Sequence, residues 1–423
     1  MKRIAIFIDG TWNRPDAEHP TNVVRLAQAV RPYGDPQVDE GDPPLGMPQI
    51  VLYSPGVGSG RGNNWAARRL DRLLGGALGW GLTDIIEEVY RNLVFVYEPG
   101  DEIMVFGFSR GAFAARSLVG LIRSCGIPRR NKLADIPKAM ARYRSRDNDT
   151  HPDHEETLKF RAKFAPDVIV NDVEEKWRRK QGMDADVARV SVAYLGVWDT
   201  VSALGLPAFL PFAGRFNAQY RFHDAKLTSM VLAARHAVSI DERRSTFPSY
   251  PWENMKALNE THDSNLVPSH MQHWFAGNHG SVGGGGNQIG LSSIALNWIA
   301  LGAAREGLAL DWSKLDTTAH HFDVTDPLDN KFGPVGLSGM LMNALTKDRE
   351  GPVAMDEMSM AAIDRCMAEP AYQRNPTLRR VYHDLHSLTP VQVEMIRAAR
   401  KWADGGYTHL PGEVTRPRNY SEK

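Results

Sequence analysis

Cysteine, net charge and long apolar runs are all scarce in this sequence. Two of its 423 residues are cysteines, Cys125 and Cys366, which are too few for a disulfide framework and lack the spacing of a zinc site. We therefore expect two buried free thiols. Fifty basic and fifty acidic residues cancel, so no overall electrostatic field favours nucleic acid or an anionic membrane as a partner.

No stretch approaches the ~20 uninterrupted apolar residues of a membrane-spanning helix, because Arg, Asp or Gly interrupts each candidate. The apolar run at residues 4–8 is too short for the core of a signal peptide, and no small-residue cleavage site follows it. That run predicts a first strand instead. We expect a protein that is made in the cytoplasm and whose export would need a signal-independent route.

Apolar runs that end in turn residues alternate with amphipathic stretches over roughly the first three hundred residues. This alternation predicts an α/β fold, a mostly parallel sheet flanked by helices. The predicted strands cover residues 4–8, 50–53, 103–106, 190–198 and 273–276, and the predicted helices cover residues 83–97, 111–124, 291–306 and 389–402.

Two segments fall outside this alternation. Residues 128–188 are rich in charge and lack strand signals, which predicts a helical insertion or lid between two core strands. From about residue 308 the chain becomes irregular and polar. We therefore expect a catalytic domain at 1–307 and a mostly helical C-terminal extension at 308–423.

The segment Gly107-Phe108-Ser109-Arg110-Gly111 carries the pattern Gly-x-Ser-x-Gly between a predicted strand and a predicted helix. In that context the pattern predicts the nucleophile turn of an α/β-hydrolase. The glycines allow a sharp turn that raises the Ser109 hydroxyl above the sheet. The helix that follows directs its N-terminal dipole at the same point. Ser109 is thus the predicted nucleophile.

A serine hydroxyl needs a histidine base that a carboxylate orients, and in this fold the chain order is serine, acid, histidine. Asp199 follows the apolar run 190–198, where open parallel sheets place functional loops. His279 follows the last predicted core strand, beside three successive glycines. We predict Asp199 as the acid and His279 as the base. The alternative base is His236, which we expect late in a helix, where histidine usually packs or caps.

Backbone N–H groups after the nucleophile and after the first strand could form an oxyanion hole. The sequence points to the N–H of Arg110 and to the turn at Gly10 and Thr11. Asp9, just before this turn, is expected to orient it through hydrogen bonds. A phosphatase of the Asp-x-Asp-Gly-Thr type is excluded, because Phe7 stands where its nucleophilic aspartate would be.

Several of these segments together resemble the DUF2235 family of α/β-hydrolases, which includes the catalytic domain of phospholipase effectors of bacterial type VI secretion. The resemblance runs in order through about residues 3–306 and rests on residues 7–13, 55–58, 100–103 with 107–111, 196–201, 236–243 and 274–279. It implies a Ser109, Asp199 and His279 triad and hydrolysis of glycerophospholipid or related carboxylic esters. Ser281 and Gly286 stand where the family pattern has aspartate and tyrosine.

The expected function is a serine hydrolase of carboxylic esters, with lipid esters as the favoured substrates and no metal or organic cofactor. Expected partners are the ester or lipid substrate, transient contact with a membrane surface, and a secretion or immunity partner that the sequence does not identify. Two alternatives stay open: an esterase, thioesterase or amidase for small acyl groups, and a catalytically weak binding protein of the same fold. The apolar residues 204–212 could form a lid or acyl-chain surface, or a packed loop.

Overall fold

The structure is a computed structural model that describes residues 1–10, 13–33, 46–56, 78–201, 226–244, 247–262, 268–316, 322–328 and 346–400. Within these residues a six-stranded sheet has the order β2-β1-β3-β6-β7-β8, and neighbouring strands are parallel. The strands are β1 Arg3–Ile8, β2 Gln49–Ser54, β3 Glu102–Phe108, β6 Val192–Trp198, β7 Ala234–Ser239 and β8 His270–Phe275. A parallel sheet with helices on both faces confirms the predicted α/β fold.

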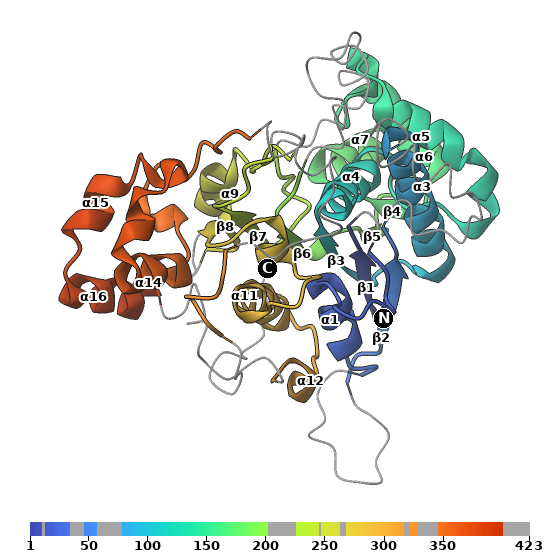
Figure 1. The fold of residues 1–423 in the computed structure, drawn as a ribbon. Coiled ribbons are helices and arrows are strands. Elements are labelled where there is room, and N and C mark those ends of the chain that lie inside the picture. Colours follow the sequence, from blue (N-terminus) through green and yellow to red (C-terminus); the bar gives the residue numbers. More distant parts are fainter. Residues whose placement is uncertain are drawn as a thin grey trace.

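Helices lie on both faces of the sheet (Figure 1), and the buried side chains form two clusters. In β1, Ile4, Ile6 and Ile8 belong to the buried cluster that contains helices α3, Leu78–Val96, and α4, Arg110–Cys125. Ala5 and Phe7 point to the other layer, with α1, Asn22–Ala29, and α11, Gly290–Arg305. Successive side chains of a strand face opposite ways. Each helix layer therefore covers one face of the sheet.

The five predicted strands are present, but β7 was missed and corrects one expectation. The sequence predicted a helix around His236, whereas Ala234–Ser239 is a fully buried strand between β6 and β8. Alanine and arginine favour helices in isolation. A central strand position overrides that preference, because its backbone groups pair on both sides and its small side chains fit against α11.

The charged insertion is helical, with α5 Ile136–Arg144, α6 Glu155–Phe164 and α7 Asp172–Lys180, besides the 3-10 turns Arg130–Asp135 and Asn148–Thr150. It also contains the two-residue strands β4, Val168–Ile169, and β5, Ala188–Arg189, which pair in parallel with each other. Such short strands are too brief to show a period in the sequence. Arg161 of α6 donates to the carbonyls of Arg123 and Ser124, so the insertion packs near the end of α4 that lies away from Ser109. The other predicted lid, residues 204–212, lies outside the described residues.

The C-terminal part packs against the outer edge of β8 (Figure 1). Its backbone joins that edge directly, since the N–H of Ser359 donates to the carbonyl of Trp274 at 2.9 Å. Ile363 and Leu378 are fully buried in the same core as α11. The remaining helices are α9 Met255–His262, α10 His279–Gly283, α12 Trp312–Asp316, α14 Met360–Ala368, α15 Tyr382–Ser387 and α16 Pro390–Arg400, with 3-10 turns Met355–Glu357, Pro370–Arg374 and Pro376–Leu378.

The described C-terminal residues thus contribute side chains to the core that contains α11. The domain boundary at residue 307 stays a prediction. Both cysteines are buried and free, as expected. Among the described residues, every helix is too short or too polar to cross a lipid bilayer.

Candidate active site

Ser109 lies in a strained turn between β3 and α4. Its backbone has φ 59° and ψ −125°, a left-handed conformation that few non-glycine residues adopt. Its N–H donates to the carbonyl of Trp198 on the neighbouring strand at 3.1 Å. A Cβ at Gly111 would lie 2.2 Å from the carbonyl oxygen of Ile8. Glycine is therefore required for α4 to pass this close to β1.

Asp199 leaves the end of β6 at the same level of the sheet. Phe108 and Trp198 are paired across β3 and β6, so the residues after them, Ser109 and Asp199, leave adjacent strands side by side. Asp199 also has a positive φ, 35°, and its side chain is fully buried. The N–H of Ser239 donates to its Oδ1 atom at 2.9 Å.

His279 begins the short helix α10, and its Nδ1 atom lies 2.6 Å from Oδ2 of Asp199. Its ring centroid lies 4.6 Å from that of Phe108 and 5.0 Å from that of Phe247. Burial lowers the pKa of His279 below its ordinary value despite the Asp199 carboxylate. With Nδ1 bonded to Asp199, Nε2 remains as the basic nitrogen. The structure thus joins His279 to Asp199 and packs its ring against the residue before Ser109.

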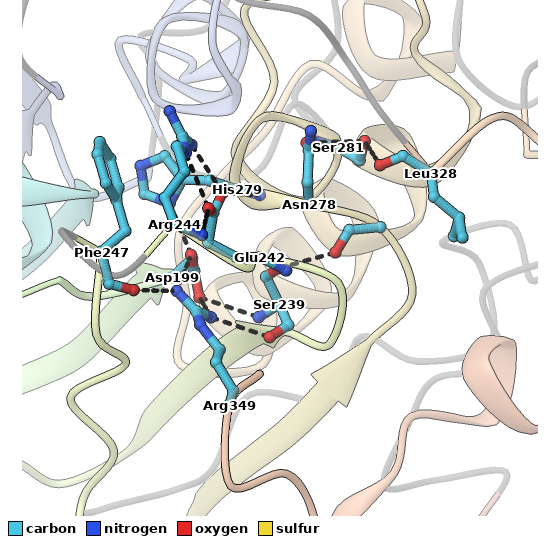
Figure 2. A network of polar contacts seen from close by, with 11 residues as sticks. Asp199, Ser239, Glu242, Arg244, Phe247, Asn278, His279, Ser281, Leu328 and Arg349 are labelled. Carbon is cyan, nitrogen blue, oxygen red and sulfur yellow. Dashed lines mark hydrogen bonds and ion pairs between the residues drawn. The ribbon is translucent and has the colours of Figure 1, made fainter. Parts of the chain in front are cut away.

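Arg349 is a further charged residue of this cluster, and sequence reasoning missed it. Its Nη1 lies 2.6 Å from Oδ1 of Asp199, and its Nη2 lies 3.0 Å from Oδ2 (Figure 2). Burial alone would raise the pKa of Asp199, but the charge of Arg349 and the hydrogen bond with His279 hold it below its ordinary value. An arginine in an irregular polar segment, 150 residues from Asp199, carries no local motif that could have revealed it.

The predicted oxyanion donors lie at the start of α4 and beside Ser109. Arg110 is the first residue of α4, and N–H groups of a first helical turn lack partners inside the helix. A Cβ at Gly10 would lie 3.2 Å from the Cβ of Ser109, so this turn contacts the nucleophile. The Gly10 N–H donates to Oδ1 of Asp9 at 2.7 Å, and an oxyanion would compete with that carboxylate. Thr11 lies outside the described residues.

Asp9 organises this turn as expected. Its Oδ2 atom accepts hydrogen bonds from the hydroxyls of Thr21 at 2.8 Å and Tyr53 at 2.9 Å. Burial raises the pKa of Asp9 to about 6. These bonds link the ends of β1 and β2 to the start of α1.

His236, the alternative base, forms its hydrogen bonds with Thr200 and Gln272. Its Nε2 atom accepts the Thr200 N–H at 3.1 Å, and its Nδ1 atom lies 2.9 Å from Oε1 of Gln272. Burial, with the charge of Arg116, lowers its pKa to about 3. Both ring nitrogens of His236 are therefore engaged in bonds that hold β6, β7 and β8 together.

Ser281, one of the two departures from the family pattern, stabilises the turn that carries His279. Its hydroxyl donates to the carbonyl of Leu328 at 2.8 Å, and its N–H donates to Oδ1 of Asn278 at 3.0 Å. Gly286 lies just beyond α10. The hydrogen bonds of Ser281 thus help to fix the start of α10.

The parallel sheet has a strained serine between a strand and a helix, and an acid–histidine pair follows the carboxyl ends of other strands. These features define a protein of the α/β-hydrolase type. A scan against family models adds the particular family. Residues 2–301 match the model described as "T6SS, Phospholipase effector Tle1-like, catalytic domain". The chain belongs to this family, which confirms the resemblance read from the sequence. The family is one of phospholipase catalytic domains, and therefore of hydrolases.

Individual relatives are more distant. The chain is 28% identical over 255 residues to the uncharacterized protein YEL023C of Saccharomyces cerevisiae, covering 58% of this chain and 32% of that protein. It aligns with the structure of the Tle1 effector bound to the VgrG spike from the type 6 secretion system, at 18% identity and a TM-score of 0.36, covering 69% of this chain and 52% of that one. A crystal structure of an uncharacterized protein from Pseudomonas aeruginosa aligns at 17% identity and a TM-score of 0.36, over 98% of this chain and 56% of that one. The chain thus spans about a third of the yeast protein and about half of each structure.

Proposed function

We propose that this protein is a serine hydrolase that cleaves carboxylic esters of lipids, with Ser109 as nucleophile, His279 as base and Asp199 as the acid that orients it. The observation that carries the proposal is the strained Ser109 turn between β3 and α4. It lies at the carboxyl ends of the strands, where Asp199 and His279 are hydrogen-bonded at 2.6 Å. Membership of a phospholipase family supports a lipid ester as the substrate. That family consists of type VI secretion effectors, and export by such a system is part of the proposal.

The mechanism follows from the roles these groups take in other serine hydrolases. Ser109 Oγ attacks the ester carbonyl while Nε2 of His279 accepts its proton. Asp199 holds the imidazole through Nδ1 and stabilises the imidazolium. The N–H of Arg110 and the turn at Gly10 and Thr11 stabilise the oxyanion. The alcohol leaves with the proton from His279, and water then hydrolyses the acyl-enzyme by the same path.

The first experiment compares wild type with Ser109→Ala, Asp199→Asn and His279→Ala on p-nitrophenyl esters and on phospholipid vesicles. Loss of a triad member is expected to lower kcat by at least ~10³-fold, because the three groups act as a unit. Circular dichroism and thermal unfolding establish that each variant is folded. Full activity in a folded Ser109→Ala variant would overturn the proposal.

Two variants serve as controls. Ser117→Ala removes another buried hydroxyl of α4, one without a hydrogen-bond partner in the described part of the chain. It should leave kcat within about twofold of wild type. His236→Asn tests the alternative base and should lower stability far more than kcat, because His236 bridges Thr200 and Gln272. A loss of ~10³-fold in folded His236→Asn, with His279→Ala active, would transfer the base role to His236.

The same assay separates the alternatives. Preference for short acyl chains and no activation by vesicles would indicate an esterase, thioesterase or amidase for small acyl groups. Failure of a fluorophosphonate to label Ser109 would indicate a catalytically weak binding protein. Transient contact with a membrane surface is part of the lipid-ester proposal, and vesicle co-sedimentation measures it directly.

A further inference from the structure

The Asp199 carboxylate has more partners than a triad needs. His279 and the Ser239 N–H each approach one of its oxygens, and the guanidinium of Arg349 approaches both. Figure 2 shows Arg349 reaching Asp199 from the side opposite to His279. A carboxylate offers about four acceptor positions, so these contacts saturate it.

Arg349 is itself fixed by other bonds. Its Nη1 donates to the carbonyl of Ser239 and its Nη2 to the carbonyl of Phe247, both at 2.9 Å. The side chain is 4% exposed and that of Asp199 is fully buried. An isolated charge is expensive to bury, whereas a bidentate pair whose two Nη atoms also bond to carbonyls is tolerated. Only Nε of Arg349 lacks a hydrogen-bond partner among the described residues.

The segment that contains Arg349 is also bonded to the loop that follows β7. The N–H of Lys347 donates to the carbonyl of Arg243 at 2.7 Å, and Asp348 pairs with the Arg243 side chain at 2.8 Å. Thr346 forms an antiparallel bridge with Arg244. All four residues from 346 to 349 lie outside the family-matched residues 2–301. The acid at the candidate site is thus held by a part of the chain that the family model does not include.

We propose that Arg349 is a positioning residue, which holds the Asp199 carboxylate aimed at His279 and balances its negative charge while His279 is neutral. This inference rests on the proposed function. When His279 takes the proton from Ser109, the imidazolium forms beside an ion pair of zero net charge rather than beside a bare carboxylate. Arg349 therefore opposes protonation of His279 and keeps it free as a base.

Other charges also face His279, and they set the background for this effect. Arg244 and Glu242, from the loop after β7, both affect the pKa of His279. The Glu242 carboxylate also accepts the backbone N–H of His279 at 3.3 Å. Arg244 pairs with Glu242 at 2.7 Å, and the two shift the His279 pKa in opposite directions. Arg110, at the start of α4, carries a further charge next to Arg244. Substituting Arg349 leaves these groups in place.

The test measures the titration of His279 by NMR in wild type, Arg349→Gln, Arg349→Met and Arg349→Lys. In the neutral variants the His279 pKa should rise by about one unit, because removal of a nearby like charge favours the imidazolium. Arg349→Lys retains the charge and should stay close to wild type. The neutral variants should also lower kcat by about 10- to 100-fold with little change in KM, since Asp199 loses its orientation.

Arg365→Gln is the matched control. Arg365 is another arginine of the C-terminal part, 4% exposed, and it donates to the carbonyls of Val324 and Asp326 rather than to Asp199. It should lower stability without moving the His279 titration. An unchanged or lowered His279 pKa in a folded neutral Arg349 variant would overturn the inference.

Failure of both neutral variants to fold would also overturn the inference, because it would assign Arg349 a purely structural role. The NMR readout needs no substrate. A wild-type protein without esterase activity would therefore refute the proposed function while leaving the His279 shift measurable.

Discussion

Two non-glycine residues of the described chain have a positive φ, and they are Ser109 and Asp199, the proposed nucleophile and acid. Each such conformation costs of order 1–3 kcal/mol and persists only where the surrounding structure fixes it. Their contacts supply that restraint: the Ser109 N–H bonds to the Trp198 carbonyl, and the Asp199 N–H bonds to the Ala237 carbonyl at 2.7 Å. Strain is thus concentrated at the two residues that the chemistry needs.

The charge state of His279 predicts how activity depends on pH. Its pKa lies below the ordinary 6.5, so the neutral base is present above that lowered pKa and is lost as the pH falls through it. The acidic limb of kcat/KM should therefore lie below pH 6.5, since kcat/KM reports the free enzyme. Rates on a p-nitrophenyl ester, followed at a wavelength insensitive to nitrophenol ionisation, measure this limb. A midpoint at or above pH 6.5 would contradict the prediction.

At the scale of elements, the local sequence pattern was sufficient to predict the strand and the helix on either side of Ser109. The run before Ser109 and the small-residue helix after it have strong local signals, and the structure contains both as β3 and α4. The strand β7 has no such signal, because Arg235 and His236 interrupt its apolar residues. Only its place between β6 and β8, with Arg235 stacked on Trp298 at 5.0 Å, makes this segment a strand.

The crossing of α4 over β1 predicts a sharp effect of Gly111→Ala. The new Cβ would lie 2.2 Å from the Ile8 carbonyl oxygen and 2.4 Å from that of Asp9, so the Ser109 turn must shift. We expect a loss of about 1–3 kcal/mol or more in the free energy of unfolding, together with loss of most ester turnover. Urea unfolding and p-nitrophenyl ester assays measure both.

Gly100→Ala is the comparison for that substitution. Gly100 has φ +96° and no atom within 4 Å of a new Cβ. We therefore expect backbone strain alone to lower the free energy of unfolding, by about 1–2 kcal/mol. Its turnover should match wild type once the protein is folded. Equal turnover in both variants would show that the α4 crossing does not position Ser109.

At the scale of the molecule, the fold class and the three triad candidates could be read from the sequence, but the role of the C-terminal part could not. Its contacts are long-range: the Tyr372 hydroxyl and the Asn375 amide both donate to Asp241, at 2.7 Å and 2.5 Å. Asp241 follows β7 and also accepts the Gly277 N–H at 2.6 Å. No periodicity links residues more than 130 positions apart, as Tyr372 and Asp241 are.

These contacts predict that a chain ending at residue 345 will not fold as the full chain does. It would lose Arg349 and the Asp241 anchors, and would expose core positions that Met358, Ile363 and Leu378 cover. Burial of each such side chain is worth roughly 1.5–3 kcal/mol, so we expect low soluble yield or a loss of cooperative thermal unfolding. Arg380→Ala, which removes an exposed pair with Glu350, should change the melting temperature little. A truncated chain with wild-type melting would refute the prediction.

The 150 residues between Asp199 and Arg349 have a consequence for the order of events during synthesis. A ribosome adds about 5–20 residues per second, so Ser109, Asp199 and His279 have all been translated several seconds before Arg349 is. Asp199 would lack its counter-charge until Arg349 emerges. If Arg349 positions Asp199 as proposed, the site would reach full turnover only after Arg349 has been added and packed, several seconds after its three triad candidates.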